Sequence, residues 1–175
     1  ATPPALSKAA QKRLEALAPD DNSADAAWLR APTLRHGDWL KDNEIRVALR
    51  HQWERLFETF DVVVTPVAPL PAFHHNHSEP KDARTYPVGF EDGTREVRFL
   101  DLFHWAGLPV LPGLPATSFP VGLDDEGLPV SAQAVGPYLE DRTTIAFAQL
   151  LEQIYGGFTA PPGYGADPAT GASRP

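Results

Sequence analysis

The chain has 175 residues, which is enough for one ordinary domain with a hydrophobic core. Apolar residues make up 42% and charged residues 22%, the balance of a soluble globular protein rather than of a disordered or fibrous one. The net charge of −8 argues against nucleic-acid binding, and no apolar run approaches the roughly 20 residues of a membrane-spanning helix.

The absence of cysteine excludes disulfides, thiolate metal sites and cysteine nucleophiles. Methionine is also absent, so the chain does not begin at an initiator residue, and its first residues show no signal-peptide pattern. We therefore expect a piece of a longer protein, with a cytoplasmic location and no membrane partner.

The first 35 residues predict a helical N-terminal segment. Residues 7–18 form an amphipathic pattern that Pro19 ends, and residues 24–29 form a shorter one. The strongest helix is predicted from Asn43, a plausible N-cap, to Phe60. Its apolar positions follow the 3.6-residue period and predict one buried stripe: Ile45, Leu49, Trp53, Leu56, Phe57 and Phe60.

The run DVVVTP at residues 61–66 is typical of a strand buried on both faces. The proline-rich residues 66–87 predict an ordered surface loop. Residues 88–98 then alternate as a minor hairpin around Asp92-Gly93, and a helix is expected over residues 99–106.

Two further strands are predicted at residues 116–121 and 129–135, joined by a polar hairpin or a wider connection. A last helix starts after Asp141 as N-cap and ends at Gly156-Gly157. Its expected core-facing residues are Ile145, Ala148, Leu151 and Ile154. The tail of residues 158–175 is rich in Pro, Gly and Ala and is predicted to be peripheral or disordered.

The valine run at residues 62–64 predicts a central strand, and a central strand needs neighbours on both edges. This chain scarcely supplies them. We therefore expect residues 36–157 to contribute to a sheet that polypeptide outside this chain completes.

Three blocks of the sequence resemble the C-terminal half of the amidase signature family, in that family's order and spacing across roughly residues 36–162. They read WERLF followed by DVVVTP at 53–66, GLPATSFPVG at 113–122, and GLPVSAQAVG at 127–136. The resemblance implies an α/β class, with this chain forming the C-terminal part of an α/β/α sandwich around a large mixed β-sheet. It also implies amide hydrolysis by a Ser–cis-Ser–Lys triad, with no cofactor and no metal.

In that family the triad lies upstream, in a Gly/Ser-rich stretch that this sequence lacks. The six serines are isolated, and none of the four lysines stands in the family's lysine context. No catalytic residue is therefore assigned to this chain. Ser118 has no base at a recognisable spacing, and we interpret it as structural.

The resemblance places residues 103–105 near the substrate, where Phe103, His104 and Trp105 would form an aromatic wall with one polar atom. The alternative is that these are core residues of an amphipathic helix. Thr65, at the end of its strand, is a further substrate-binding candidate, with a turn-forming role as the alternative. Gln133 either touches ligand or satisfies buried backbone groups at a sheet edge.

The run His74-His75-Asn76-His77 suggests a weak metal site, but a solvated loop is the preferred interpretation because the loop has no cysteine and few carboxylates. Residues 124–126 are acidic and are interpreted as a solvated turn, since the alternating oxygens of a calcium loop are absent.

We thus predict the C-terminal portion of an amidase acting on a carboxylic or aryl amide, inactive without its missing N-terminal part, with a homodimer left open. Two alternatives remain, a non-catalytic interaction module and a processed structural subunit of a two-chain amidase.

Overall fold

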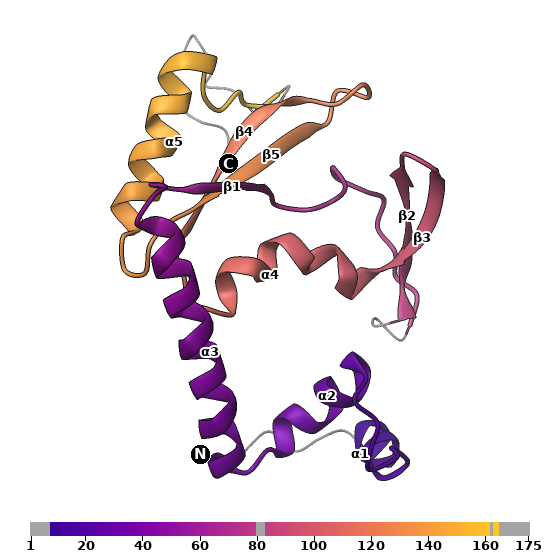
Figure 1. The fold of residues 1–175 in the computed structure, drawn as a ribbon. Coiled ribbons are helices and arrows are strands. Elements are labelled where there is room, and N and C mark those ends of the chain that lie inside the picture. Colours follow the sequence, from indigo (N-terminus) through magenta and orange to yellow (C-terminus); the bar gives the residue numbers. More distant parts are fainter. Residues whose placement is uncertain (1–7, 80–82, 162, 165–175) are drawn as a thin grey trace. The chain divides into compact units, whose positions relative to one another are not determined.

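The computed structural model describes residues 8–79, 83–161 and 163–164. These residues form two compact units, the first ending at Val47 and the second beginning at Ala48. Helices and antiparallel sheets combine in an α/β fold, as the sequence predicts (Figure 1). Most of the predicted tail (residue 162 and residues 165–175) lies outside the described residues, as does the first residue of the predicted first helix.

The first unit is helical. It contains α1 (Lys8–Glu15), α2 (Ala24–Arg30) and a short 3-10 turn, η1 (Ala31–Thr33). Ser23 caps α2, because its hydroxyl accepts a hydrogen bond from the Ala26 amide at 3.2 Å. Hydrogen bonds from the backbone and side chain of the same Ser23 lower the pKa of the Asp21 carboxyl.

Helix α3 (His36–Phe57) begins seven residues earlier than predicted and spans the boundary between the units. Asn43 is therefore not an N-cap but an interior residue, and its side-chain oxygen accepts a hydrogen bond from Arg46 Nε at 3.0 Å. Of the predicted buried stripe, Leu49, Trp53 and Phe57 are half-buried, whereas Ile45, Leu56 and Phe60 are exposed. No residue of α3 is buried, and Ile45 is 70% exposed.

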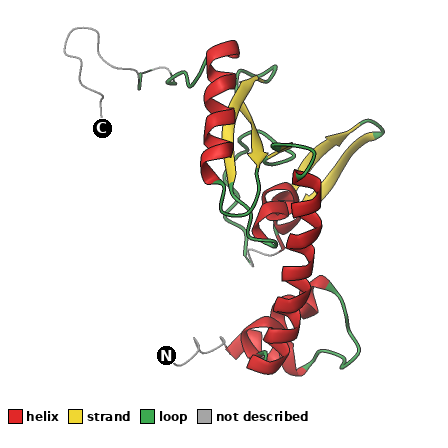
Figure 2. Ribbon diagram, turned by 60° about the vertical axis from the view of Figure 1, so that its left-hand side comes forward, coloured by secondary structure: helices red, strands yellow, loops and turns green. Residues whose placement is uncertain are grey.

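A three-stranded antiparallel sheet forms the centre of the second unit. Strands β1 (Val63–Pro66), β5 (Pro129–Val135) and β4 (Ala116–Leu123) lie in the order β1-β5-β4. The middle strand β5 pairs with both neighbours and carries the most buried residues of the sheet, Ala134 and Val135. Figure 2 shows these strands in yellow.

Strand β1 lies at an edge of this sheet, with β5 as its single partner among the described strands. The Val64 side chain is 52% exposed. The run of valines thus has one unpaired edge and an exposed residue at Val64. This agrees with the expectation that the chain supplies too few strands to surround β1.

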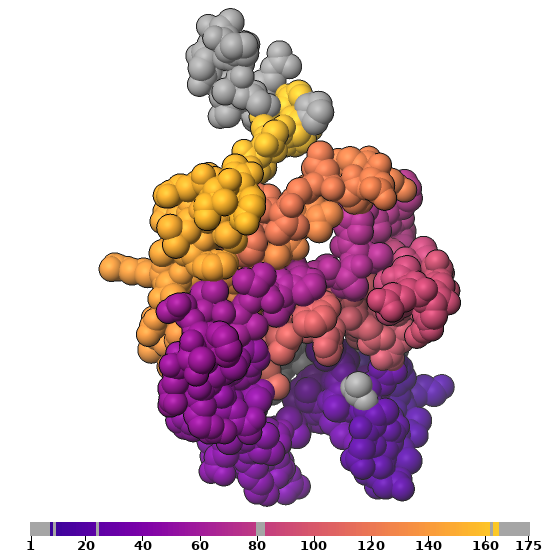
Figure 3. Space-filling model, turned by 45° about the horizontal axis from the view of Figure 1, so that its top comes forward, coloured from indigo at the N-terminus to yellow at the C-terminus, as the bar shows by residue number. Residues whose placement is uncertain are grey.

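Helix α5 (Asp141–Tyr155) packs on β4 and β5 (Figures 1 and 3). The buried Thr144 hydroxyl lies 2.8 Å from Thr117 Oγ1 of β4 and donates to the Asp141 carbonyl at 2.9 Å. Ala148 and Leu151 are half-buried as predicted, but Ile145 and Ile154 are exposed. The N-cap is Glu140 rather than Asp141.

The remaining elements are a hairpin and the helical segment that follows it. The hairpin consists of β2 (Thr85–Phe90) and β3 (Gly93–Arg98), and it leads into η3 (Phe99–Phe103) and α4 (His104–Val110). The hairpin turn is Glu91-Asp92, one residue earlier than the predicted Asp92-Gly93, and Gly93 begins β3 with a φ of 127°. A small core joins hairpin and helix: Tyr86, Val88 and Leu102, flanked by Leu70, Val97 and Phe99.

Arg50 ties α3 to two loops of the second unit. Its Nε donates to the Pro112 carbonyl at 2.7 Å, and its guanidinium carbon lies 3.6 Å from the centre of the Tyr138 ring. We expect R50K to lower the free energy of unfolding by about 1–2 kcal/mol, because an ammonium cannot stack and bond in this geometry. Denaturant unfolding measures this, with R55K as the control because Arg55 bonds only within its own helix. Equal effects of both variants would contradict the assignment.

Candidate functional site

Thr65, at the end of β1, is buried, with 8% of its surface exposed. Its hydroxyl donates to the Pro66 carbonyl at 3.0 Å and accepts a hydrogen bond from Gln133 Nε2 at 3.0 Å. Thr65 is therefore part of a hydrogen-bond network that connects β1 to β5.

Gln133 lies on β5 and is 4% exposed. Besides the bond to Thr65, its Nε2 donates to the Trp105 carbonyl of α4 at 2.9 Å. A carbonyl can only accept, so the amide nitrogen of Gln133 must face Trp105. The side chain satisfies a backbone group, as the second of the two interpretations expects, but from the middle strand rather than from a sheet edge.

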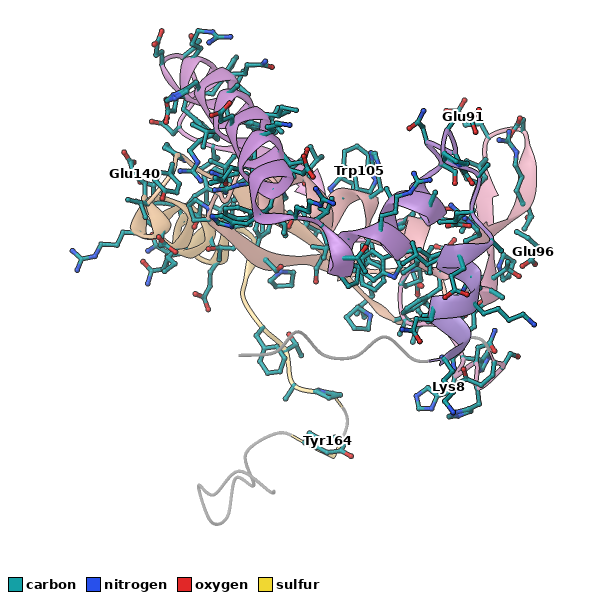
Figure 4. All side chains as sticks on the ribbon, turned by 90° about the horizontal axis from the view of Figure 1, so that it is seen from below. Lys8, Glu91, Glu96, Trp105, Glu140 and Tyr164 are labelled. Carbon is teal, nitrogen blue, oxygen red and sulfur yellow. The ribbon has the colours of Figure 1, made fainter. Side chains whose placement is uncertain are left out.

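The three aromatic candidates lie together where η3 meets α4. Phe103 is 51% exposed, His104 is exposed and Trp105 is half-buried, with the Trp105 side chain labelled in Figure 4. The His104 and Trp105 rings meet edge to face with centroids 5.5 Å apart, and Phe103 meets Phe99 in the same way at 5.1 Å. Of this group, the Trp105 backbone is linked through its carbonyl to Gln133, which in turn bonds to Thr65.

The histidine loop lies elsewhere. His74, His75 and His77 line a hollow of about 970 Å³ together with Asp124, Asp125 and Glu126. No group of three or more histidine, aspartate or glutamate side chains in the described part of the chain is arranged to hold a metal ion. Asp124 instead forms the turn between β4 and β5, because its side chain accepts from the amides of Glu126 and Leu128.

The described residues contain no hydrogen bond between a serine hydroxyl and a lysine or histidine side chain. The Ser23 hydroxyl caps α2, and Lys41 forms an exposed ion pair with Asp38 at 3.3 Å. No helix in the described ranges is long and apolar enough to cross a membrane.

Sequence reasoning missed the link from Gln133 to Trp105. The available signal is a glutamine flanked by alanines in an otherwise apolar strand, because a buried amide requires partners. Which backbone group supplies the partner, 28 residues away along the chain, depends on the tertiary fold.

Comparison with known proteins gives a consistent result. The family model described as Amidase matches residues 22–145, more than half of the chain. The chain is 31% identical over 128 residues to a Glutamyl-tRNA(Gln) amidotransferase subunit of Exiguobacterium sp., covering 69% of this chain and 22% of that protein. It is 32% identical over 127 residues to the same subunit of Rhodospirillum rubrum, covering 72% of this chain and 22% of that one.

Solved structures show the same fold. A crystal structure of an amidase matches with a TM-score of 0.54 at 28% identity, over 84% of this chain and 31% of that one. The corresponding Glutamyl-tRNA(Gln) amidotransferase subunit of Thermotoga maritima matches in fold with a TM-score of 0.53 at 22% identity, over 78% of this chain and 26% of that one. The chain thus spans about a fifth of the length of the curated relatives it matches. It belongs to the amidase family.

Proposed function

We propose that this chain is the C-terminal portion of an amidase that hydrolyses a carboxylic or aryl amide, and that the Ser–cis-Ser–Lys triad lies in a segment upstream of it. The family match over residues 22–145 carries this proposal. Amide hydrolysis needs an activated nucleophile, a base and donors for the developing oxyanion. The described part of this chain contains no serine bonded to a base, so these groups are assigned to the upstream segment.

In this proposal the chain completes the sheet and forms one wall of the acyl-binding cleft. Phe103, His104 and Trp105 contribute the wall, and Thr65 lies at its base. Support comes from the exposure of Phe103 and His104, which would be unusual for core residues of a short helix. An aromatic wall with a single imidazole favours an aryl or aliphatic acyl group over a charged one.

W105A in the longer protein tests this wall. We expect the ratio of kcat/KM values for a large and a small acyl amide to change by about tenfold, because Trp105 would contact only the larger group. F90A is the control, since Phe90 is an exposed aromatic on the β2–β3 hairpin. An unchanged ratio with lowered stability would assign Trp105 to the core.

The alternative is a structural subunit of a multi-chain amidase, which the names of the relatives favour because they are subunits of amidotransferases. Purification of the natural protein separates the two. A chain well above 19.1 kDa that hydrolyses amides without a partner supports the amidase portion, whereas a chain that copurifies with a second polypeptide and is inactive without it supports the subunit.

A further inference from the structure

Pro109 lies inside α4 and removes a hydrogen bond from that helix. In an α-helix the carbonyl of each residue accepts from the amide four residues later. For Trp105 that residue is Pro109, which has no N–H to donate. The Trp105 carbonyl therefore needs a donor from outside the helix, because an unpaired carbonyl in this surrounding is costly.

Gln133 supplies that donor. Its Nε2 lies 2.9 Å from the Trp105 oxygen and 3.0 Å from Thr65 Oγ1. The Thr65 hydroxyl directs its own proton to the Pro66 carbonyl, so that it presents a lone pair to Gln133. These two hydrogen bonds fix the orientation of the Gln133 amide. Because only 4% of the Gln133 surface is exposed, water has little access to compete for them.

The start of α4 has no side-chain cap of its own. The helix has seven residues, its N-cap Phe103 makes no side-chain capping bond, and short helices have little stability of their own. The direction in which the Trp105 ring leaves the backbone depends on the backbone at that residue. The hydrogen bond to the Trp105 carbonyl fixes that backbone against the sheet.

We propose that Gln133 is a positioning residue for substrate specificity, which replaces the donor missing at Pro109 and thereby sets the orientation of Trp105. The part of this inference that concerns specificity rests on the proposed function. Gln133 does not touch substrate, and Thr65 acts through it. The substrate class is the aryl or aliphatic acyl group that the Trp105 ring would contact.

The test uses the longer protein that contains this chain, with two readouts. One is the ratio of kcat/KM values for a large and a small acyl amide. The other is the fluorescence emission of Trp105 in a background where Trp28, Trp39, Trp53 and every tryptophan outside this chain are replaced by phenylalanine. Q133L removes both donors at similar volume, and we expect it to change the ratio by about tenfold and to shift the emission.

Three further variants separate positioning from general stability. T65S keeps the hydroxyl and should shift both readouts much less than T65V, which should shift them in the same direction as Q133L. P109A restores an amide opposite the Trp105 carbonyl. In that background Q133L should have a clearly smaller effect, a coupling that a double-mutant cycle measures.

Q133E adds a pH-dependent readout. An ionised carboxylate only accepts and faces the Trp105 carbonyl, so wild-type specificity is lost. Burial raises the pKa of the introduced carboxyl, and its protonated form donates one hydrogen bond. The acyl ratio should therefore return toward the wild-type value as the pH falls.

A Q133L protein with lower thermal stability but an unchanged acyl ratio and unchanged Trp105 emission would overturn the inference. So would an equal effect of Q133L with and without P109A. A wild-type protein that hydrolyses no amide would instead refute the proposed function, while the Trp105 emission would still decide whether Gln133 positions α4.

Discussion

The isolated 175-residue chain is expected to hydrolyse no amide, and activity is expected to appear only when the upstream segment is present. None of the described serine hydroxyls is hydrogen-bonded to a lysine or histidine side chain. In this part of the chain no such base is therefore placed to accept a proton from a serine nucleophile. Losing the nucleophile, base and oxyanion donors together removes all covalent catalysis. Assays of the chain alone and of the longer protein on the same aryl and aliphatic amides measure this difference.

S118A is the matched control for that experiment. Ser118 lies on β4 opposite Gln133 of β5, and we interpret it as structural. In the longer protein S118A should leave kcat unchanged within about twofold, because the residue takes no part in the reaction. Turnover by the isolated chain that S118A abolishes would contradict the placement of the triad upstream.

The second large effect is expected at Gly136. A Cβ atom added there would lie 2.5 Å from Thr144 Cγ2, far inside van der Waals contact. Thr144 cannot rotate its methyl away without losing the hydrogen bonds of its hydroxyl to Thr117 and Asp141. G136A should therefore lower the free energy of unfolding by about 1–3 kcal/mol, which denaturant unfolding measures.

Two variants test the cause of that loss. T144S removes the clashing methyl but keeps the hydroxyl, so the double variant G136A/T144S should recover most of the stability lost in G136A. G89A should cost little, because no atom lies within 4 Å of a Cβ added at Gly89. A G136A effect that T144S leaves unchanged would show that backbone strain, and not this contact, is responsible.

Local patterns in the sequence were sufficient to predict the strands and most helices. The alternation at 129–135 predicts β5 at its observed bounds, and the Asp92-Gly93 pair predicts the hairpin turn to within one residue. The start of α3 was missed because Asn43 has the residue type of a cap, yet residues 36–42 before it continue the helix. Asn43 instead pairs with Arg46 three residues later.

Tertiary contacts decided what the patterns left undetermined. In α5 the apolar period selects the correct side at Ala148 and Leu151, which are half-buried, but it does not predict which residue lies deepest. Thr144 lies against Gly136 and its hydroxyl bonds to Thr117 of β4, so Thr144 faces the sheet. Ile145 and Ile154 are left exposed. The helix predicted to end at residue 106 continues to Val110 as α4. Pro109 leaves the Trp105 carbonyl without a donor inside the helix, and Gln133 donates to it instead.

In the longer protein we expect β1 to be an interior strand of a larger sheet. In an antiparallel pair, alternate amides point to the partner strand and the others point away. Hydrogen–deuterium exchange of the Val63, Val64 and Thr65 amides in the longer protein tests this. We predict slow exchange at all three, because a strand from outside this chain bonds the edge opposite β5. Fast exchange at the amides that point away from β5 would show an edge open to solvent and would contradict an interior position for β1.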